Sequence, residues 1–173
     1  MARRMIEVRE SLIHGRGVFA TRPIARGTRI IEYTGERVSW EEADRREELK
    51  AADDTHTMLF TVDKKTVIDA TRRGSDARFI NHACLGNCRS YIDGKRVYIE
   101  SRRTIQPGEE LSYDYKLQMD GEKITKKLRK MYACRCGTPR CRGTLLYVPR
   151  ERPAAAKRPA KAKAATKARA STR

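Results

Sequence analysis

Short runs of apolar and β-branched residues recur along residues 1–148 and predict a body built mainly from strands. The pattern alternates at 7–9, becomes apolar at 18–20 after a turn at 15–17, and forms a β-rich run at 29–33. Further strands are predicted at 57–62, 66–68, 96–101 and 110–115, with turns at 63–65 and 107–108.

One polar stretch interrupts these strands and predicts a helix. Ser39 suits an N-cap, because its side chain can accept a hydrogen bond from the first helical turn. Glu41 and Glu42 then place negative charge near the positive end of the helix dipole. The helix is predicted to run as far as Ala52. Many short strands with few helices indicate a mainly β domain.

Composition adds a strong positive charge to this picture. The chain has 173 residues, a net charge of +17 and 39% hydrophobic residues, enough for one domain with a core. The charge favours a polyanion or another acidic partner. No apolar run is long enough to cross a bilayer, and no apolar signal stretch follows Met1, so we expect a soluble cytoplasmic protein without a membrane partner. In that compartment five cysteines indicate a metal or reduced thiols before disulfides.

The positive charge is concentrated at the C-terminus. Residues 149–173 consist almost entirely of Lys, Arg, Ala and Pro, and we expect a disordered tail because nothing there offers an apolar face to bury. This tail has nine Lys or Arg and one Glu, about half of the net charge. It either solubilises the protein or binds nucleic acid by neutralising phosphates, and the same residue types would serve as a nuclear address.

Directional polar groups crowd the stretch 78–88. Asn81, His82, Cys84, Asn87 and Cys88 follow one another closely, and each polar group must find a partner if it is buried. One interpretation is a cysteine-bearing loop whose Asn and His satisfy local backbone groups. The other is a functional site.

Three cysteines near the end of the body have metal-ligand spacing. Cys134, Cys136 and Cys141 would supply three thiolates, and structural Zn²⁺ takes four ligands. The donors available for the fourth position are His14, His56, His82, Cys84 and Cys88. We favour Cys84, because it would tie the central stretch to the C-terminal loop. The alternative is three unrelated reduced thiols.

Two weaker motifs complete the candidate chemistry. Tyr113 and Tyr115 are two positions apart, so on a strand both side chains point to one face and can line one pocket; the alternative is that they only pack a sheet. Gly15 and Gly17 flank Arg16 and would let the backbone approach a ligand closely, although glycine pairs also make ordinary turns.

Taken in order along residues 14–146, these motifs resemble a SET domain followed by a post-SET zinc loop. The residues that carry the resemblance are Gly15, Arg16, Gly17, Tyr33, Thr34, Gly35, Arg78, Phe79, Ile80, Asn81, His82, Cys84, Asn87, Cys88, residues 110–115, Cys134, Cys136, Cys141, Arg142 and Gly143. The resemblance implies a mainly β SET fold of several small curved sheets with a knot-like crossing, short helices and a C-terminal zinc loop. It divides the chain into a SET domain (5–116), a linker with the post-SET zinc segment (117–148) and the disordered basic tail (149–173).

The resemblance also implies an activity and residue roles. SET proteins are mostly protein-lysine methyltransferases that use S-adenosylmethionine. The residues similar to those that bind this cofactor are His14, Arg16, Gly17, Arg78, Asn81, His82, Tyr115 and Leu145. Tyr115 matches the catalytic tyrosine, with Tyr33 beside it, and Tyr33, Phe60 and Tyr113 would line a lysine channel. Cys84, Cys134, Cys136 and Cys141 would hold structural Zn²⁺, which leaves Cys88 without a metal role.

These roles predict a product and a substrate. The hydroxyl of Tyr113 would occupy room that a more methylated amine needs, so we expect mono- or dimethylation of lysine. Because a basic enzyme and a basic substrate repel each other, DNA contacted through the tail could hold both, which favours a DNA-associated or histone-like substrate. The alternatives are a non-catalytic SET-like module that holds lysine, and a nucleic-acid-binding protein that acts through its tail. We expect a cytoplasmic location, with association with a nucleoid or chromatin or export to another cell left open, as is the oligomeric state.

Overall fold

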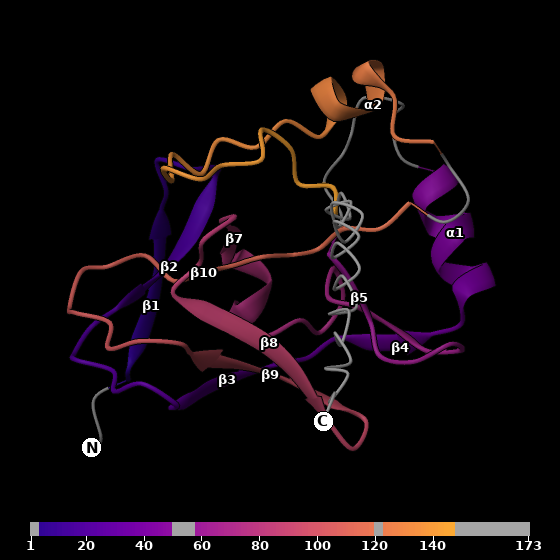
Figure 1. The fold of residues 1–173 in the computed structure, drawn as a ribbon. Coiled ribbons are helices and arrows are strands. Elements are labelled where there is room, and N and C mark those ends of the chain that lie inside the picture. Colours follow the sequence, from indigo (N-terminus) through magenta and orange to yellow (C-terminus); the bar gives the residue numbers. More distant parts are fainter. Residues whose placement is uncertain (1–3, 50–57, 120–122, 148–173) are drawn as a thin grey trace, which may run out of the picture.

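The computed structural model describes residues 4–49, 58–119 and 123–147 (Figure 1). Within these ranges the chain forms ten strands, two α-helices and one 3₁₀ turn. The strands are β1 (Ile6–Glu10), β2 (Arg16–Ala20), β3 (Arg29–Tyr33), β4 (Glu36–Val38), β5 (Leu59–Thr61), β6 (Val67–Asp69), β7 (Asn81–His82), β8 (Cys88–Asp93), β9 (Arg96–Ser101) and β10 (Ser112–Tyr113). The helices are α1 (Trp40–Glu48) and α2 (Lys126–Met131), and the 3₁₀ turn is η1 (Asp76–Phe79).

The strands form several small sheets rather than one large one. In the described ranges β1 pairs with β2, β9 lies between β3 and β8, and β6 lies between β4 and β5, all with antiparallel neighbours. The fourth sheet joins β7 and β10 in parallel. This arrangement confirms the predicted mainly β fold with few short helices.

The hydrophobic core gathers side chains from segments far apart in the sequence. Val18 of β2 and Val97 and Ile99 of β9 are fully buried, and Ile105 and Leu111 join them from the segment between β9 and β10. Burial of such an aliphatic side chain contributes about 1.5–3 kcal/mol to folding. The core therefore joins the N-terminal hairpin to the strands that follow β7.

Most predicted strands are present, and the last one is shorter than predicted. β3 and β9 have the predicted bounds, and β5 pairs with β6 around the predicted turn. The strand predicted at 110–115 is wrong at both ends, because only Ser112 and Tyr113 pair with β7. β4 and β8 were not predicted. Tyr115 therefore lies beyond the strand rather than on it.

Helix α1 begins as predicted, and charged side chains fasten it to the strands. The Ser39 hydroxyl accepts a hydrogen bond from the Glu42 N–H at 3.3 Å. The guanidinium of Arg46 lies 2.6 Å from a carboxylate oxygen of the buried Asp69 and 3.0 Å from one of Glu36. The helix ends at Glu48, and the predicted continuation to Ala52 runs outside the described residues.

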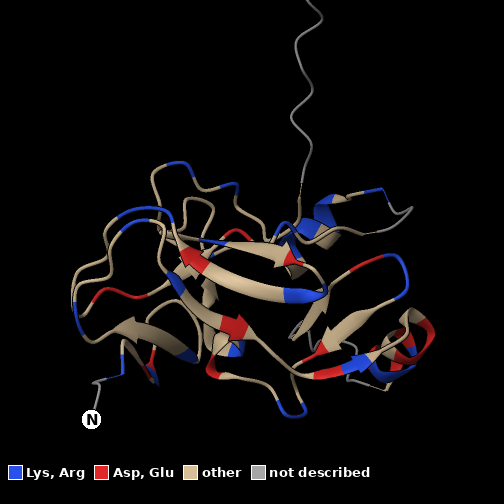
Figure 2. Ribbon diagram, turned by 90° about the horizontal axis from the view of Figure 1, so that it is seen from below, with Lys and Arg blue, Asp and Glu red and all other residues tan. Residues whose placement is uncertain are grey.

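The two helices differ in charge. In Figure 2 the ribbon of α1 carries both red acidic and blue basic segments, whereas α2 carries blue without red.

The predicted basic tail, 149–173, lies outside the described residues. In the part of the chain that is described, no helix is long and apolar enough to cross a membrane.

Candidate functional site

A pocket of about 480 Å³ lies between the turn before β2, the segment from η1 to β7, and the segment 130–145. It gathers all but one of the residues predicted to contact a cofactor. The predicted residues that line it are His14, Arg16, Arg78, Asn81, His82, Tyr115 and Leu145. Side chains from three distant parts of the sequence therefore share one cavity.

Gly17 is the predicted cofactor residue that is not in the lining of this pocket. A Cβ at this position would lie 2.4 Å from a carboxylate oxygen of Glu110. Close packing against Glu110 accounts for this glycine. Gly15 does line the pocket, and its φ of +44° lies in the left-handed region that favours glycine.

Asn81 holds the turn that forms one wall of the pocket. Its Nδ2 lies 3.2 Å from the carbonyl oxygen of His14 and 3.0 Å from that of Arg16. The same nitrogen is 3.1 Å from the Ser11 hydroxyl and 2.8 Å from a Glu110 carboxylate oxygen. An amide nitrogen has two hydrogens, so these four acceptors share them. The sequence analysis missed Ser11 and assigned no role to Glu110.

His82 lies between the pocket and the cysteines. Its Nδ1 accepts a hydrogen bond from the Tyr115 N–H at 3.1 Å, which leaves the ring hydrogen on Nε2, 3.3 Å from the Cys84 sulfur. Burial lowers the pKa of His82 to about 4; the Asp114 carboxylate opposes this shift and Arg142 adds to it. The ring is therefore neutral at pH 7 and donates toward Cys84.

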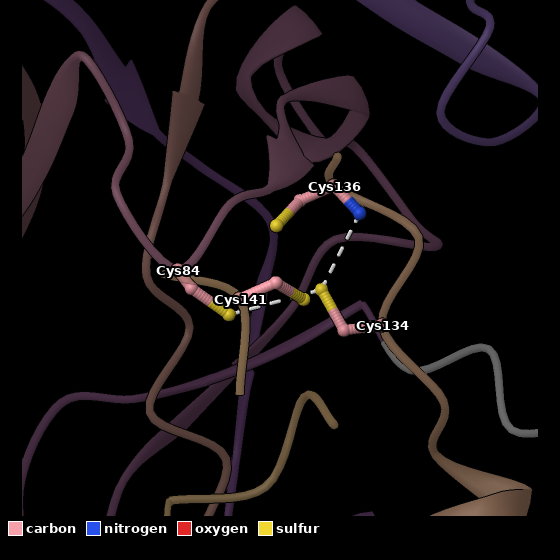
Figure 3. A group of neighbouring side chains, drawn as sticks. All are labelled: Cys84, Cys134, Cys136 and Cys141. Carbon is pink, nitrogen blue, oxygen red and sulfur yellow. Dashed lines mark hydrogen bonds between the residues drawn. The ribbon is translucent and has the colours of Figure 1, made fainter. Parts of the chain in front are cut away.

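Four cysteine sulfurs form a cluster with the geometry of a zinc site (Figure 3). The Sγ atoms of Cys84, Cys134, Cys136 and Cys141 all lie within 4.8 Å of one another, and those of Cys84 and Cys134 are 3.8 Å apart. Tetrahedral Zn²⁺ with Zn–S bonds of about 2.3 Å separates its sulfurs by about 3.8 Å. The cluster fits Zn²⁺ and confirms Cys84 as the fourth member, while Cys88 is buried separately in β8.

Backbone amides point at these sulfurs. The Arg142 N–H donates to the Cys84 sulfur at 3.3 Å, the Cys136 N–H to that of Cys134 at 3.4 Å, and the Gly143 N–H to that of Cys141 at 3.3 Å. Such donors favour the thiolate form that a metal requires. The local backbone is therefore arranged for metal-bound sulfur.

Aromatic rings stand beside the pocket. The centroids of Tyr33 and Phe60 are 5.3 Å apart, and those of Tyr113 and Tyr115 are 4.9 Å apart. Tyr33 and Tyr113 are buried, and of these four residues only Tyr115 is among those that line the pocket. The Tyr33 hydroxyl donates to the carbonyl oxygen of Met58, a pocket residue, at 2.8 Å. The predicted channel residues thus lie in two aromatic pairs, Tyr33 with Phe60 and Tyr113 with Tyr115, and Tyr115 reaches the pocket.

The hydroxyl groups of these tyrosines remain protonated. Burial raises the pKa of Tyr33, Tyr113 and Tyr115 above the usual value near 10. The Tyr115 hydroxyl donates to the carbonyl oxygen of Ile80 at 2.7 Å. At pH 7 these phenols can orient a substrate by hydrogen bonds, but they do not act as phenolate bases.

An ion pair connects the cysteine cluster to the tyrosines. The Arg142 guanidinium contacts both carboxylate oxygens of Asp114, at 2.6 and 2.9 Å. Burial raises the pKa of Asp114, but the bonds from Arg142 outweigh it and the pKa is lowered overall. Asp114 stands between Tyr113 and Tyr115 in the chain, so Arg142 can position both. The sequence analysis missed this pair.

Several further pocket residues were also missed. They are Ile13, Met58, Leu117, Lys130, Met131, Ala133 and Arg135; Gly15, Phe79 and Cys134, which the sequence motifs already included, line the pocket as well. Arg135 is the one with a signal in the sequence, because it lies between two cysteines of the metal motif. The others are brought to the pocket only by the fold.

The fold and site together define a class: a small mainly β domain whose pocket borders a cluster of four cysteines that could hold a metal ion. The family model described as SET domain matches residues 15–116, and the chain belongs to the SET-domain family.

Its relatives are proteins named as histone-lysine methyltransferases. The chain is 40% identical over 141 residues to histone-lysine N-methyltransferase trithorax of Drosophila virilis, covering 79% of this chain and 4% of the relative. It is 43% identical over 144 residues to the H3 lysine-4 specific histone-lysine N-methyltransferase of Candida albicans, covering 78% of this chain and 13% of the relative. It is 40% identical over 149 residues to histone H3-lysine(4) N-trimethyltransferase ATX1 of Arabidopsis thaliana, covering 83% and 13%. The chain thus spans a small fraction of these relatives.

A solved structure is similar as well. The chain resembles a structure described as ctPRC2 in an autoinhibited conformation bound to S-adenosylmethionine, with a TM-score of 0.61 and 32% sequence identity. The similarity covers 66% of this chain and 15% of the other.

Proposed function

We propose that the protein is an S-adenosylmethionine-dependent protein-lysine N-methyltransferase that adds one or two methyl groups to a basic, DNA-associated or histone-like protein. The observation that carries this proposal is the pocket, which gathers His14, Asn81, His82 and Tyr115 in a chain of the SET-domain family. Relatives named as histone-lysine methyltransferases and a similar structure bound to S-adenosylmethionine support it.

The pocket residues offer both polar and apolar contacts to such a cofactor. Asn81 and His82 would bind its amino acid and adenine portions, and Leu145 would cover the adenine from the post-SET side. Arg16 and Arg78 add positive charge to the wall. When bound, S-adenosylmethionine supplies a methyl group on a cationic sulfonium.

The aromatic pairs prepare the lysine. An amine has an ordinary pKa near 10.4, and desolvation between Tyr33, Phe60 and Tyr113 disfavours its ammonium form, so the pKa of the lysine falls. The neutral hydroxyl of Tyr115 can then orient the amine, whose lone pair would attack the methyl carbon as the carbon–sulfur bond breaks and the thioether, S-adenosylhomocysteine, leaves with the electron pair. Alignment of the two reactants supplies several kcal/mol of the barrier reduction, on the order of 7–11 in favourable cases.

Zn²⁺ would have a structural role. Held by Cys84, Cys134, Cys136 and Cys141, it would fasten the segment that contains Leu145 and Met131 to the wall of the pocket. Four thiolates close its coordination shell, as in structural zinc sites, and leave no position for a reacting water.

Methyl transfer from labelled S-adenosylmethionine to a panel of basic proteins, including the chain itself, tests the proposal. We expect Tyr115→Phe to lower label incorporation roughly 100-fold by misaligning the amine, while calorimetry still detects cofactor binding. Tyr91→Phe is the matched control, because it removes a hydroxyl that accepts from Arg29 on the exposed side of β8.

Two outcomes would contradict the proposal. Zinc-loaded, folded protein that fails to bind S-adenosylmethionine would exclude methyl transfer. Cofactor binding without label on any protein of the panel would favour a non-catalytic lysine-binding module instead.

A further inference from the structure

The C-terminal segment of the body, residues 116–147, has few acidic residues. Between Lys116 and Tyr147 the sequence contains nine Lys or Arg and only two acids, Asp120 and Glu122, both outside the described residues. By contrast, α1 alternates acids with arginines that form ion pairs. The segment therefore has seven more basic than acidic residues.

Most of these cations are exposed and unpaired within the described ranges. The exposed ones are Lys116, Lys123, Lys126, Lys127, Arg129, Lys130, Arg135 and Arg140. Among described residues the ion pairs of this segment are limited to that of Arg142 with Asp114. Four of the six residues of α2 are basic, and none of its residues is buried. The exposed cations of α2 and its flanks are thus without a partner among the described residues, and in Figure 2 the ribbon of α2 is blue without red.

This segment folds as one unit next to the pocket. Leu117 forms a bridge with Leu146, and Ala133 forms one with Thr144. The Leu145 N–H donates to the carbonyl oxygen of Tyr132 at 2.9 Å, directly after α2. Lys130 and Arg135 also line the pocket. The positive face therefore borders the site that we propose for methyl transfer.

We infer that the exposed basic residues 116–140, centred on α2, form a docking surface for duplex DNA that is separate from the C-terminal tail. Duplex DNA presents one phosphate charge per about 1.7 Å of axis, which suits a row of exposed cations. Anionic lipid fits less well, because α2 exposes a single apolar side chain, Met131, and its other apolar residue, Leu128, is half-buried. DNA held here would bring a bound basic protein to the pocket, a consequence that rests on the proposed function.

The test must separate this surface from the tail. The background is the full chain in which the nine basic residues after 149 are replaced by Gln, so that DNA binding reports the body. On it, Lys126→Gln, Lys127→Gln and Arg129→Gln remove three charges from α2 without altering a pocket residue. Lys64→Gln, Lys65→Gln and Lys95→Gln form the matched control, because these exposed lysines lie in two turns near Asp63.

Fluorescence anisotropy of a labelled 20-base-pair duplex across a salt series gives the readout. We expect the α2 variant to bind roughly 10-fold more weakly and its slope of log affinity against log salt to fall by up to about 2.7, since each lost phosphate contact accounts for about 0.9. The control should change little. The inference would be overturned if the α2 variant bound DNA with the same affinity and salt slope as its background, or if the control variant lost as much affinity. It would also be overturned if the α2 substitutions weakened binding to phosphatidylglycerol vesicles but not to DNA.

Methyl transfer then links the surface to activity. The α2 variant should methylate a short lysine peptide as the background does, but should lose most of its activity on a basic protein bound to DNA. Failure of all methyl transfer would refute the proposed function and leave the DNA-binding result to decide the docking surface by itself.

Discussion

At the residue scale, Asn81, His82 and Tyr115 each make a structural hydrogen bond as well as lining the pocket. The amide nitrogen of Asn81 is engaged by the turn before β2, and His82 bonds the Tyr115 backbone on one side and Cys84 on the other. The Tyr115 hydroxyl donates to Ile80. Such bonds restrict rotamers, and a preorganised site loses less entropy when it binds its reactants.

Tyr113 is the residue that we expect to limit the product. Its ring is buried, with its centroid 4.9 Å from that of Tyr115, so its hydroxyl occupies space among the aromatic side chains. Tyr113→Phe should remove that obstacle and shift the product from mono- and dimethyllysine toward trimethyllysine, as measured by mass spectrometry of the modified peptide. The Arabidopsis relative is named as a trimethyltransferase. Efficient trimethylation by the native form of the present protein would refute this prediction.

Arg142 should act as a positioning residue. Its guanidinium holds both oxygens of Asp114, and its backbone N–H donates to Cys84, so it connects the metal centre to the tyrosines. Arg142→Gln should raise the KM for S-adenosylmethionine about 10-fold while zinc content stays at one per chain, because the four sulfurs are untouched.

Two variants control for a merely general effect of charge. Arg140→Gln removes an exposed neighbouring cation and should leave the KM unchanged. Arg142→Lys keeps the charge but loses the two-pronged contact, so it should rescue only part of the defect. A KM for Arg142→Gln equal to that of the native protein would show that Asp114 needs no partner.

At the element scale, prediction from sequence succeeded where the signal was local. The Ser39 cap and the apolar run of β3 are carried by adjacent residues, and both were found. The parallel pair of β7 and β10 has two residues in each strand, and it depends on Gly86, where a Cβ would lie 2.3 Å from the Ser112 carbonyl oxygen. No periodicity can reveal a contact of that kind. The spacing of the C-terminal cysteines is a local signal, so the sequence predicted the cysteine cluster. Most residues of the post-SET pocket wall come together only in the fold, so they were missed.

The attachment of α1 to β6 should make stability depend on pH. Burial raises the pKa of Asp69, but bonds from Thr71 and Arg46 outweigh it, so the pKa is lowered overall. The pKa of Asp69 is lower in the folded protein than in the unfolded chain, where it is near 3.9, so its ionised carboxylate stabilises the fold at pH values above 3.9. This stabilisation is lost as the pH falls through the folded-state pKa of Asp69.

Asp69→Asn should therefore be less stable than the native protein at pH 6, and the gap in free energy of unfolding should narrow by about half or more by pH 3. Urea denaturation at several pH values measures this. Asp44→Asn, an exposed change on α1, should show no such trend. If the difference in free energy of unfolding between Asp69→Asn and the native protein were constant with pH, the ionised carboxylate of Asp69 would contribute nothing to stability.

At the scale of the whole molecule, few apolar contacts hold the segment 123–147 to the strands. Only Thr144 and Leu146 are buried within it, and α2 buries nothing. Yet this segment supplies Met131, Arg135 and Leu145 to the pocket. In Figure 1 it is the orange-to-yellow part of the chain and lies along one side of the strands. Zn²⁺ bound by Cys84 and the three cysteines of this segment would fasten it to the body.

Removal of Zn²⁺ should therefore weaken cofactor binding before it unfolds the domain. With a chelator, or in Cys134→Ser, we expect the affinity for S-adenosylmethionine in calorimetry to fall about 10-fold or more, because the folding of a metal-held segment is coupled to the metal. Far-UV circular dichroism should keep its strand signal, since the buried core lies in β2, β9 and their neighbours. Cys88→Ala is the matched control: that thiol is buried in β8 outside the cluster, so zinc content and cofactor affinity should stay unchanged. Undiminished cofactor affinity in the zinc-free protein would mean that Thr144 and Leu146 alone hold the wall in place, and the metal would then have no part in forming the pocket.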